Sequence, residues 1–436
     1  MEPVNVGLLG LGTVGGGTVN VLARNADEIA RRAGRSIRIT HAVTRDLSQP
    51  RICDTSGIEL SDDPYAVVDN PDIDVIVELI GGESSAKELV MRAIEQHKHV
   101  VTANKALIAV HGNDIFRAAQ EQGVMVAFEA AVGGGISIIK SIREGLAGNR
   151  IEWLAGIING TSNYILTAMR DRGRDFEDVL AEAQRLGYAE ADPTFDIEGV
   201  DAAHKLTILA AIAFGIPLQF DKVYTEGISR ISNLDIQHAD ELGYRIKHLG
   251  IAKRCEDGVE LRVHPALIPE RQLVANVDGV MNAIVVKGDA VGPTLYYGAG
   301  AGAEPTASAV VADLVDVVRA LTTDPNNRVP HLAFQPDALT DLPILPAEAF
   351  RTAYFLTLEA VDRPGVLADV TRVLGGLAIS IEAIMQKEPV AGAETVRVII
   401  LTQRTEERLM NQALSEIEKL ESIAAPVGRI RVEYLD

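Results

Sequence analysis

The chain has 436 residues, and at roughly 150 residues per domain this length suggests about three domains with sizeable cores. Its composition of 47% hydrophobic and 23% charged residues is ordinary for a globular protein. The 61 acidic and 41 basic residues give a net charge of −20, which argues against nucleic acid or an anionic membrane surface as a partner.

Export and membrane segments are not predicted. The longest apolar stretch, 206–218, is shorter than the roughly 20 residues that a bilayer span needs. The start of the chain lacks the basic region of a signal peptide, so we expect a cytoplasmic location. Cys53 and Cys255 cannot build a disulfide framework or a four-ligand zinc site, and neither has a companion histidine. Both are interpreted as inert.

Strands and helices alternate through residues 1–130. The first strand, 4–9, is apolar throughout, as expected for a strand buried on both faces of a sheet. Further strands are predicted at 37–43, 75–79, 100–102 and 124–128, with helices at 16–33, 86–96 and 115–122. This alternation predicts an α/β fold, a Rossmann-like doubly wound parallel sheet, completed by a later helix at 304–322.

Residues 131–322 mix glycine-rich turns, long helices and alternating strands, which predicts a central α+β domain. The clearest elements are helices at 176–186 and 200–214 and strands at 261–268 and 283–287. Residues 323–352 hold prolines at 325, 330, 336, 343 and 346. Such a density of proline predicts a linker or a wrapping arm.

The last unit, 353–436, has the order strand, helix, strand, strand, helix, strand. Its strands are predicted at 353–361, 379–386, 395–402 and 427–434, and its helices at 364–377 and 406–418. The order βαββαβ predicts a ferredoxin-like domain.

A glycine-rich turn directly follows the first strand, with Gly10, Gly12 and Gly15 in the spacing G-x-G-x-x-G. The first glycine allows a tight turn, the second lets the backbone approach a pyrophosphate, and the third lets helix and strand pack closely. This context favours dinucleotide binding, with a purely structural turn as the alternative. After the second strand, Arg45 suits the 2′-phosphate of NADP, whereas Asp46 keeps NAD open, and we favour NADP slightly.

Asp201 and Lys205 are spaced i, i+4 on the helix predicted at 200–214 and therefore share one face. Such a pair is usually a surface salt bridge, but this helix is otherwise apolar, and a lysine at a buried edge can donate or accept a proton. His204 is expected to face elsewhere and to be structural. Glu190 lies in a polar loop and Lys105 follows the fourth strand, where the ligand crevice of a doubly wound sheet lies.

Taken together, the motifs resemble homoserine dehydrogenase. The segments that carry the resemblance are Gly-Leu-Gly-Thr-Val-Gly (10–15), Thr-Ala-Asn-Lys-Ala (102–106), Asn-Gly-Thr-Ser-Asn-Tyr (159–164), Gly-Tyr-Ala-Glu-Ala-Asp-Pro (187–193) and Asp-Ala-Ala-His-Lys (201–205). The tail motif Asp-Arg-Pro-Gly-Val-Leu-Ala (362–368) resembles an ACT domain, the regulatory module of the long bacterial forms. Together these segments cover essentially the whole chain.

The resemblance implies NAD(P)-dependent interconversion of L-homoserine and L-aspartate 4-semialdehyde in threonine, methionine and isoleucine biosynthesis. Lys205 would be the general acid/base, Glu190 and Asp201 would hold the homoserine end, and Lys105 would lie by substrate and nicotinamide. The cofactor positions implied are Thr13, Val14, Gly187 and Gly302, in addition to Gly10, Leu11, Gly12, Gly15, Arg45 and Lys105.

Three further expectations come from the same resemblance. A monovalent cation, typically sodium, would bind at Glu129 with the backbone carbonyls of Val132, Gly134 and Ile136. Threonine would bind the ACT domain as a feedback inhibitor at Asp362, Gly365, Val366 and Leu367, near a helix N-terminus whose amides are free. An ACT domain that only dimerises is the alternative. The protein would be a homodimer or homotetramer.

Two rival functions fit the residues less well. Aspartate-semialdehyde dehydrogenase needs a cysteine nucleophile, and neither Cys53 nor Cys255 is placed for one. An amino-acid sensor with a vestigial dinucleotide fold would be expected to lack Lys205 or Glu190, and both are present.

Overall fold

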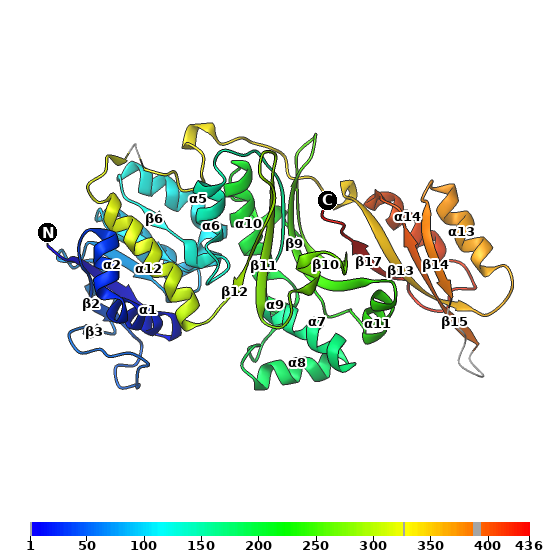
Figure 1. Ribbon diagram of the computed structural model, residues 1–436, viewed down its shortest axis with the longest axis horizontal. Helices are drawn as coiled ribbons and strands as arrows, with labels where there is room; N and C mark the ends of the chain where they lie inside the picture. The colour runs from blue at the N-terminus through cyan, green and yellow to red at the C-terminus, as the bar shows by residue number, and fades with distance from the viewer. Residues whose placement is uncertain (1, 326–327, 387–393) are drawn as a thin grey trace.

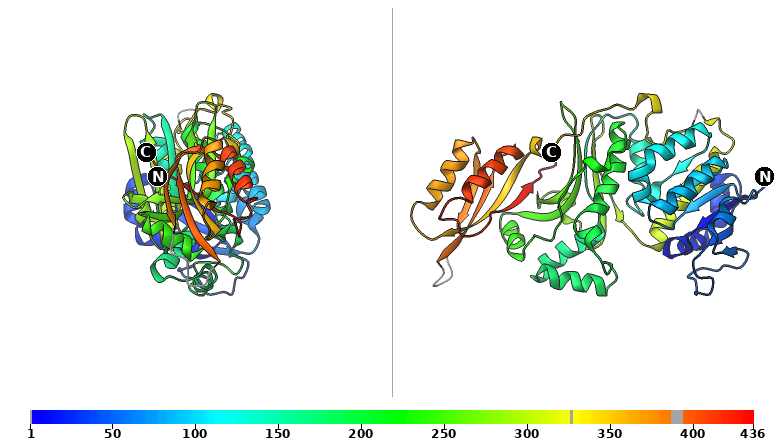
Figure 2. Two further views of the ribbon diagram at one scale, coloured as in Figure 1. Left: turned by 90° about the vertical axis from the view of Figure 1, so that its right-hand side faces the viewer. Right: turned by 180° about the vertical axis from the view of Figure 1, so that it is seen from behind.

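The structure is a computed structural model that describes residues 2–325, 328–386 and 394–436. Residues 326 and 327 of the predicted linker and residues 387–393 of the predicted last unit lie outside this description. The described chain is elongated, with a small parallel sheet at one end and a long mixed sheet through the middle and the other end (Figures 1 and 2). None of its described helices has the length and apolar character that a membrane span requires.

The first sheet has the order β3-β2-β1-β4-β5-β6, and its strands pair in parallel. The strands are β1 Val4–Leu9, β2 Ile37–Val43, β3 Glu59–Ser61, β4 Val75–Glu78, β5 His99–Thr102 and β6 Val126–Ala127. Helices α1 Thr13–Arg24, α2 Ala26–Ala33, α3 Pro64–Val68, α4 Ser84–Glu95, α5 Lys105–Glu121 and the later α12 Ala303–Ala320 surround it (Figure 1). The predicted doubly wound parallel sheet is therefore confirmed.

Several element boundaries were predicted wrongly. The helix predicted at 16–33 is two helices that meet at Asn25, and the first begins at Thr13, inside the glycine motif. The helix predicted at 115–122 is only the end of α5, whose N-cap Asn104 accepts a hydrogen bond from the amide of Leu107 at 3.1 Å. The edge strand β3 was not predicted because it spans three residues and is partly exposed.

The central part of the second sheet is antiparallel, in the order β12-β11-β7-β9-β10. Its strands are β7 Ile151–Ile157, β9 Tyr244–Arg254, β10 Val259–Pro269, β11 Met281–Gly288 and β12 Gly292–Ala299, with the two-residue β8 Tyr224–Thr225 beside β10. The helices of this part are α6 Ile138–Lys140, α7 Gly160–Arg172, α8 Phe176–Arg185, α9 Thr194–Ile197, α10 Val200–Phe214 and α11 Asn233–Glu241. Helix α10 lies between the central sheet and the first domain, and it is buried from Asp201 to Phe214 (Figure 1).

The last unit has the ferredoxin-like order β17-β13-β15-β14, as predicted. Its elements are β13 Arg351–Val361, α13 Val366–Gly376, β14 Ile381–Gln386, β15 Thr395–Thr402, β16 Thr405–Glu406, α14 Glu407–Ile417 and β17 Gly428–Val432. Strand β17 also pairs in parallel with β10, through Ala266 with Arg431 and Leu267 with Val432. One sheet therefore runs from the central part into the C-terminal unit, a continuity that the sequence did not predict.

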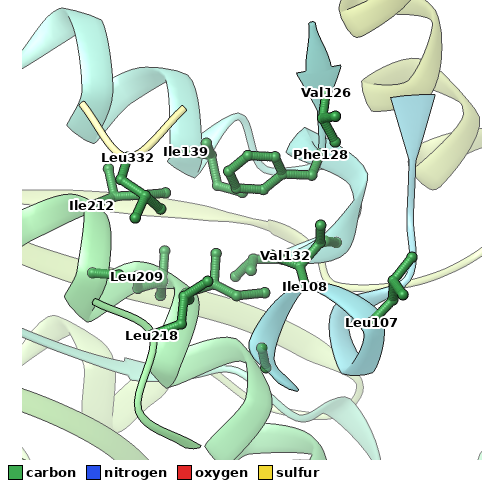
Figure 3. Close-up of a cluster of buried hydrophobic side chains, with 14 of the residues drawn as sticks. Leu107, Ile108, Val126, Phe128, Val132, Ile139, Leu209, Ile212, Leu218 and Leu332 are labelled. Atoms are coloured by element: carbon green, nitrogen blue, oxygen red, sulfur yellow. The ribbon is translucent and has the colours of Figure 1, made fainter. Parts of the chain in front are cut away.

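The proline-rich segment packs against the body of the protein. Figure 3 shows side chains of α5, α10 and this segment in one apolar cluster, among them Leu107, Ile212 and Leu332. Farther along, the amide of Thr340 donates to the carbonyl of Gly215 at the end of α10 (2.8 Å). Ile344 then bridges to β10. Of the two alternatives for this segment, the described residues fit the wrapping arm.

Candidate active site

A cluster of charges lies at the first turns of α10. Lys205 Nζ donates to Asp201 Oδ2 at 2.6 Å and to the carbonyl oxygen of Ile158 at 2.8 Å. Lys105, at the start of α5 in the nucleotide-binding domain, places its Nζ 3.1 Å from Asp201 Oδ1. The structure thus brings three of the predicted site residues together at the junction of the two domains.

The Asp201 carboxylate is ionised despite its burial. Burial alone would raise its pKa, but Lys205, Lys105 and a hydrogen bond from Asn159 hold the pKa well below its usual value. For Lys105, burial opposes the charged form, while Asp201 and the nearby charges of Asp196 and Glu190 raise the pKa overall. The Lys105–Asp201 pair is therefore fully charged at neutral pH.

Sequence reasoning did not assign Asn159 and Asp196, which support this cluster. Asn159 is the N-cap of α7, and its Oδ1 accepts from the amide of Ser162 at 2.8 Å. Its Nδ2 lies 2.8 Å from both Asp201 Oδ2 and Asp196 Oδ1. The available signal was Asn before Gly-Thr-Ser at a helix start, which is a typical N-cap pattern.

Glu190 and Gly187 lie on the exposed loop that follows α8. The backbone carbonyl of Glu190 accepts from Gln184 Nε2 at 3.1 Å. The Glu190 carboxylate has no hydrogen bond or ion pair among the described residues, although its charge acts on Lys105. It is therefore free to receive a cationic group of a ligand.

The three motif glycines have the geometry that dinucleotide binding requires. Gly10 has φ +102°, and a Cβ there would lie 2.7 Å from the carbonyl oxygen of Leu79. A Cβ on Gly15 would collide with the carbonyl of Gly10, whereas a Cβ on Gly12 would meet nothing within 4 Å. The N-terminus of α1 has no side-chain cap. The backbone at Gly12 is therefore open to a phosphate group that the amides of α1 can bind.

Two arginines lie beyond the end of β2. Arg45 is exposed and makes no ion pair within the described residues. Arg51, which sequence reasoning did not single out, donates from Nη1 to the carbonyl of Leu11 (3.1 Å) and from Nη2 to Thr44 Oγ1 (2.6 Å). Its buried Nε has no partner in the described structure. The periodicity around residue 51 offered no signal, because the residue lies in an irregular loop.

The other predicted cofactor residues lie around α1. Thr13 and Val14 form its first turn, and Leu11 precedes it. Gly302 has φ +124° and is the N-cap of α12, which packs on α1 at the close approach of Ala303 to Gly17. These residues therefore surround one end of the first sheet.

The predicted cation turn contains unpartnered backbone oxygens. Val132 and Gly134 are buried, and their carbonyl oxygens accept no hydrogen bond from the described residues. The carbonyl of Ile136 accepts from the amide of Ile138 at 2.7 Å. The Glu129 carboxylate accepts hydrogen bonds from the backbone amides of Ile139 and Lys140. Burial, together with the neighbouring charge of Asp313, raises the pKa of Glu129 to about 7. Hard, unpartnered oxygens fit a monovalent cation.

In the C-terminal unit, α13 begins after Gly365, which has φ +97° and provides no side-chain cap. Asp362 is exposed, Val366 is buried and Leu367 is partly buried. The amides of the first helical turn therefore have no side-chain partner at the N-cap, and a carboxylate could bind them.

Comparisons with known proteins agree with this geometry. Family models described as homoserine dehydrogenase match residues 138–315, and its NAD-binding domain model matches residues 10–129. An ACT domain model matches residues 354–422. A homoserine dehydrogenase from Pseudomonas aeruginosa is 66% identical, with 100% of both chains covered. One from Neisseria gonorrhoeae is 55% identical over the same coverage.

Solved structures give the same result. The crystal structure of a homoserine dehydrogenase from Thiobacillus denitrificans is 65% identical, covers 100% of this chain and 99% of its own, and superposes with a TM-score of 0.95. A Staphylococcus aureus homoserine dehydrogenase is 32% identical, with 99% of both chains covered and a TM-score of 0.76. The chain therefore belongs to the homoserine dehydrogenase family of oxidoreductases, with an NAD-binding domain and a C-terminal ACT domain.

Proposed function

We propose that this chain interconverts L-homoserine and L-aspartate 4-semialdehyde with NAD(P) in threonine, methionine and isoleucine biosynthesis. The observation that supports this most strongly is the Lys105–Asp201–Lys205 cluster at the junction with the nucleotide-binding domain. Burial raises the pKa of the Cys53 thiol, and that of Cys255 to about 11, so neither suits the thioester chemistry of the rival dehydrogenase.

Lys205 is proposed as the general acid/base. When nicotinamide is bound, it supplies the hydride in the reductive direction, so negative charge develops on the substrate carbonyl oxygen. Two of the three Lys205 N–H donors are held by Asp201 and the Ile158 carbonyl, which leaves one for the substrate. That donor stabilises the developing alkoxide and gives it a proton. In the oxidative direction Lys205 takes this proton back from the hydroxyl of homoserine.

Substrate binding is proposed to use the other charges of the site. The Glu190 carboxylate, which has no partner among the described residues, would bind the α-ammonium group of homoserine. The Asp201 carboxylate would help to hold the same end of the substrate. Lys105 would lie beside substrate and nicotinamide and add positive charge where the alkoxide forms. The exposed position of Glu190 on its loop supports this role, because a ligand can reach it.

For the cofactor we propose NADP as slightly favoured over NAD. The open backbone at Gly12 and the uncapped start of α1 would hold the diphosphate. Arg45, which is exposed and has no ion pair among the described residues, and Arg51, beside the glycine turn, are two cations available to a 2′-phosphate. Both follow β2, where the adenosine ribose of a doubly wound fold binds.

A monovalent cation, sodium in the first instance, is proposed at residues 129–136. The buried carbonyls of Val132 and Gly134 support it, and among the described residues no group of three or more acidic, cysteine or histidine side chains offers a rival metal site. The cation would stabilise this glycine turn, which contacts the backbone of Gly300. Gly300 lies two residues before the N-cap of α12.

The ACT domain is proposed to bind threonine as a feedback inhibitor at Asp362, Gly365, Val366 and Leu367, within a homodimer or homotetramer. The uncapped start of α13 supports carboxylate binding. Isothermal titration with millimolar threonine should give a saturable heat and a matching loss of activity. An absence of heat would leave the domain a dimerisation module only.

The reaction itself is tested by initial rates of NADPH and NADH oxidation with L-aspartate 4-semialdehyde, in the presence of sodium and potassium. Turnover with either cofactor supports the proposal, and the ratio of the two kcat/KM values reports the cofactor preference. Folded protein without turnover on either cofactor would contradict the proposal and favour a sensor.

A further inference from the structure

An exposed aromatic ring lies beside the Lys105–Asp201–Lys205 cluster. Phe195 lies in the short helix α9 and remains 41% exposed. The next residue, Asp196, is held by Asn159 Nδ2 at 2.8 Å, and its backbone carbonyl accepts from Ser162 Oγ at 3.1 Å. These bonds fix the backbone of α9 against α7, so α9 is held by its own contacts and not only through the exposed loop before it.

One neighbour of this ring is Lys105. The Nζ atom of Lys105 lies 5.7 Å from the ring centroid of Phe195 and 3.1 Å from Asp201 Oδ1. The Lys105 side chain is 36% exposed. Because the four-carbon stem of a lysine is flexible, its ammonium group needs contacts that hold it in one place. The ion pair supplies one restraint on its ammonium group, and the aromatic face supplies a second.

The other neighbour is His204, which is 3% exposed. Its ring lies 5.5 Å from that of Phe195 and 4.1 Å from that of Phe220. Burial lowers the pKa of His204, so the imidazole is neutral at physiological pH, and its Nδ1 has no partner in the described structure. His204 is expected to point away from the Asp201–Lys205 pair and to be structural. The stack fits this expectation, because the His204 ring packs against the ring of Phe195.

We propose that Phe195 is a positioning residue for the reaction: its ring, supported by His204 and Phe220, holds the Lys105 ammonium against Asp201 and toward the bound substrate. Phe195 does not exchange a proton and has no covalent role. The inference rests on the role proposed above for Lys105.

The first test compares substitutions at position 195 by steady-state kinetics. Phe195→Leu keeps apolar bulk without an aromatic face and should lower kcat/KM about five- to tenfold, the loss expected for a cation–π contact at a half-exposed site. Phe195→Tyr keeps the face and should stay within about twofold of wild type. Leu186→Ala, at a 51% exposed position near the same loop, is the matched control and should be unchanged. Equal losses in the Leu and Tyr variants, or no loss in Leu, would overturn the proposal.

A double-mutant cycle asks whether Phe195 acts through Lys105. In a Lys105→Met background, Phe195→Leu should cause less than a twofold further loss of kcat/KM, with thermal midpoints unchanged throughout. A five- to tenfold further loss in that background would mean that the ring acts independently, and the proposal would fail. A Lys105→Met enzyme with the wild-type rate would contradict the role of Lys105 itself. Turnover by the unmodified protein would still support the proposed reaction in that case.

Discussion

The two junctions of the central domain are both built around buried charges, and they differ in the cation that each uses. At the nucleotide-binding side, Asp201 is shared by Lys205 and by Lys105 of the neighbouring domain. At the ACT side, Arg431 of β17 bridges Glu407 in α14 and Glu226 of the central domain. At each junction a buried ion pair within one domain is joined to the other domain by a partly exposed charge, Lys105 on the nucleotide-binding side and Glu226 on the ACT side.

The two cations differ in their acid–base chemistry and not in the number of unused donors, because each leaves one N–H without an acceptor among the described residues. Arg431 donates from Nε and Nη2 to the two oxygens of Glu407 at 3.0 and 2.6 Å, from Nη1 to Glu226 at 2.7 Å, and from Nη2 to the Tyr224 hydroxyl at 2.9 Å. Lys205 has two acceptors for three donors. Arginine does not deprotonate in proteins, whereas lysine can exchange a proton. This difference agrees with the proposed catalytic role of Lys205, and we expect the arginine junction to have a structural role only.

The largest expected effect is at the lysine junction. Lys205→Ala should lower kcat at least about a hundredfold, the usual contribution of general acid–base catalysis, because the alkoxide loses its proton donor. Steady-state rates with L-aspartate 4-semialdehyde and NADPH measure this. The thermal midpoint provides the control for folding. A rate near that of wild type would remove Lys205 from the chemistry.

The arginine junction should respond in stability rather than in rate. Arg431→Met leaves the buried Glu407 without its main partner and should reduce the free energy of unfolding by about 3 kcal/mol or more. Arg408→Met breaks the ion pair with Glu406, in which the two side chains are 62% and 34% exposed, and should cost at most about 1 kcal/mol. Urea unfolding measures both variants. Equal losses of unfolding free energy in the two variants would contradict a structural role for Arg431. A large fall in the kcat of folded Arg431→Met would contradict it as well.

Asp201 and Glu407 should contribute little to acid sensitivity above pH 5. Both pKa values are lowered in the folded protein, so the stability that these carboxylates add is lost only as the pH falls below about 4, near the pKa of the unfolded carboxyl groups. Burial lowers the pKa of His99 and His331 to about 4, below their value in the unfolded chain. The stability that their neutral forms contribute is complete above pH 6.5 and is lost as the pH falls toward 4. Between pH 6.5 and 5 this loss is about 1.5 kcal/mol for each group.

Unfolding curves at these two pH values check the histidine prediction. His331→Gln keeps an acceptor for the amide of Val126, which lies 3.2 Å from His331 Nε2, but it cannot titrate. This variant should lose the part of the pH dependence that comes from His331, about 1.5 kcal/mol between pH 6.5 and 5. The other buried histidines with lowered pKa values, which are His99, His204, His248 and His264, should keep their contributions. An unchanged pH dependence would show that the acid sensitivity arises elsewhere.

The smallest expected effect concerns cofactor choice. Arg45→Ala should lower kcat/KM for NADPH about tenfold, because a charge-assisted contact to the 2′-phosphate is lost. The value for NADH should stay within about twofold, which makes NADH the internal control. Parallel losses with both cofactors would mean that Arg45 does not recognise the 2′-phosphate.

The sequence predicted those features that depend on local pattern. The i, i+4 spacing of Asp201 and Lys205 and the glycine spacing at Gly10 gave local predictions, and the structure places these residues in the predicted elements. The contact of Lys105 with Asp201 could only be expected in general terms, because it joins two domains that are distant in sequence.

Other features depend on tertiary contacts that no local pattern reveals. The pairing of β17 with β10 follows from how the C-terminal unit docks, and only two residue pairs among the described residues form it. The early start of α1 at Thr13 depends on packing, because glycine has low helix propensity and Gly17 lies against Ala303. Arg51 reaches the glycine turn from an irregular loop.

We propose that Lys205 acts by proton exchange, whereas Arg431 acts by its fixed charge. The most direct test is the kcat of Lys205→Arg, which keeps a cation beside Asp201 but cannot release a proton. With an unchanged thermal midpoint and NADPH affinity, the account predicts that kcat falls at least about a hundredfold, as in Lys205→Ala. A Lys205→Arg enzyme with nearly the wild-type kcat would show that positive charge alone is sufficient and would contradict the account.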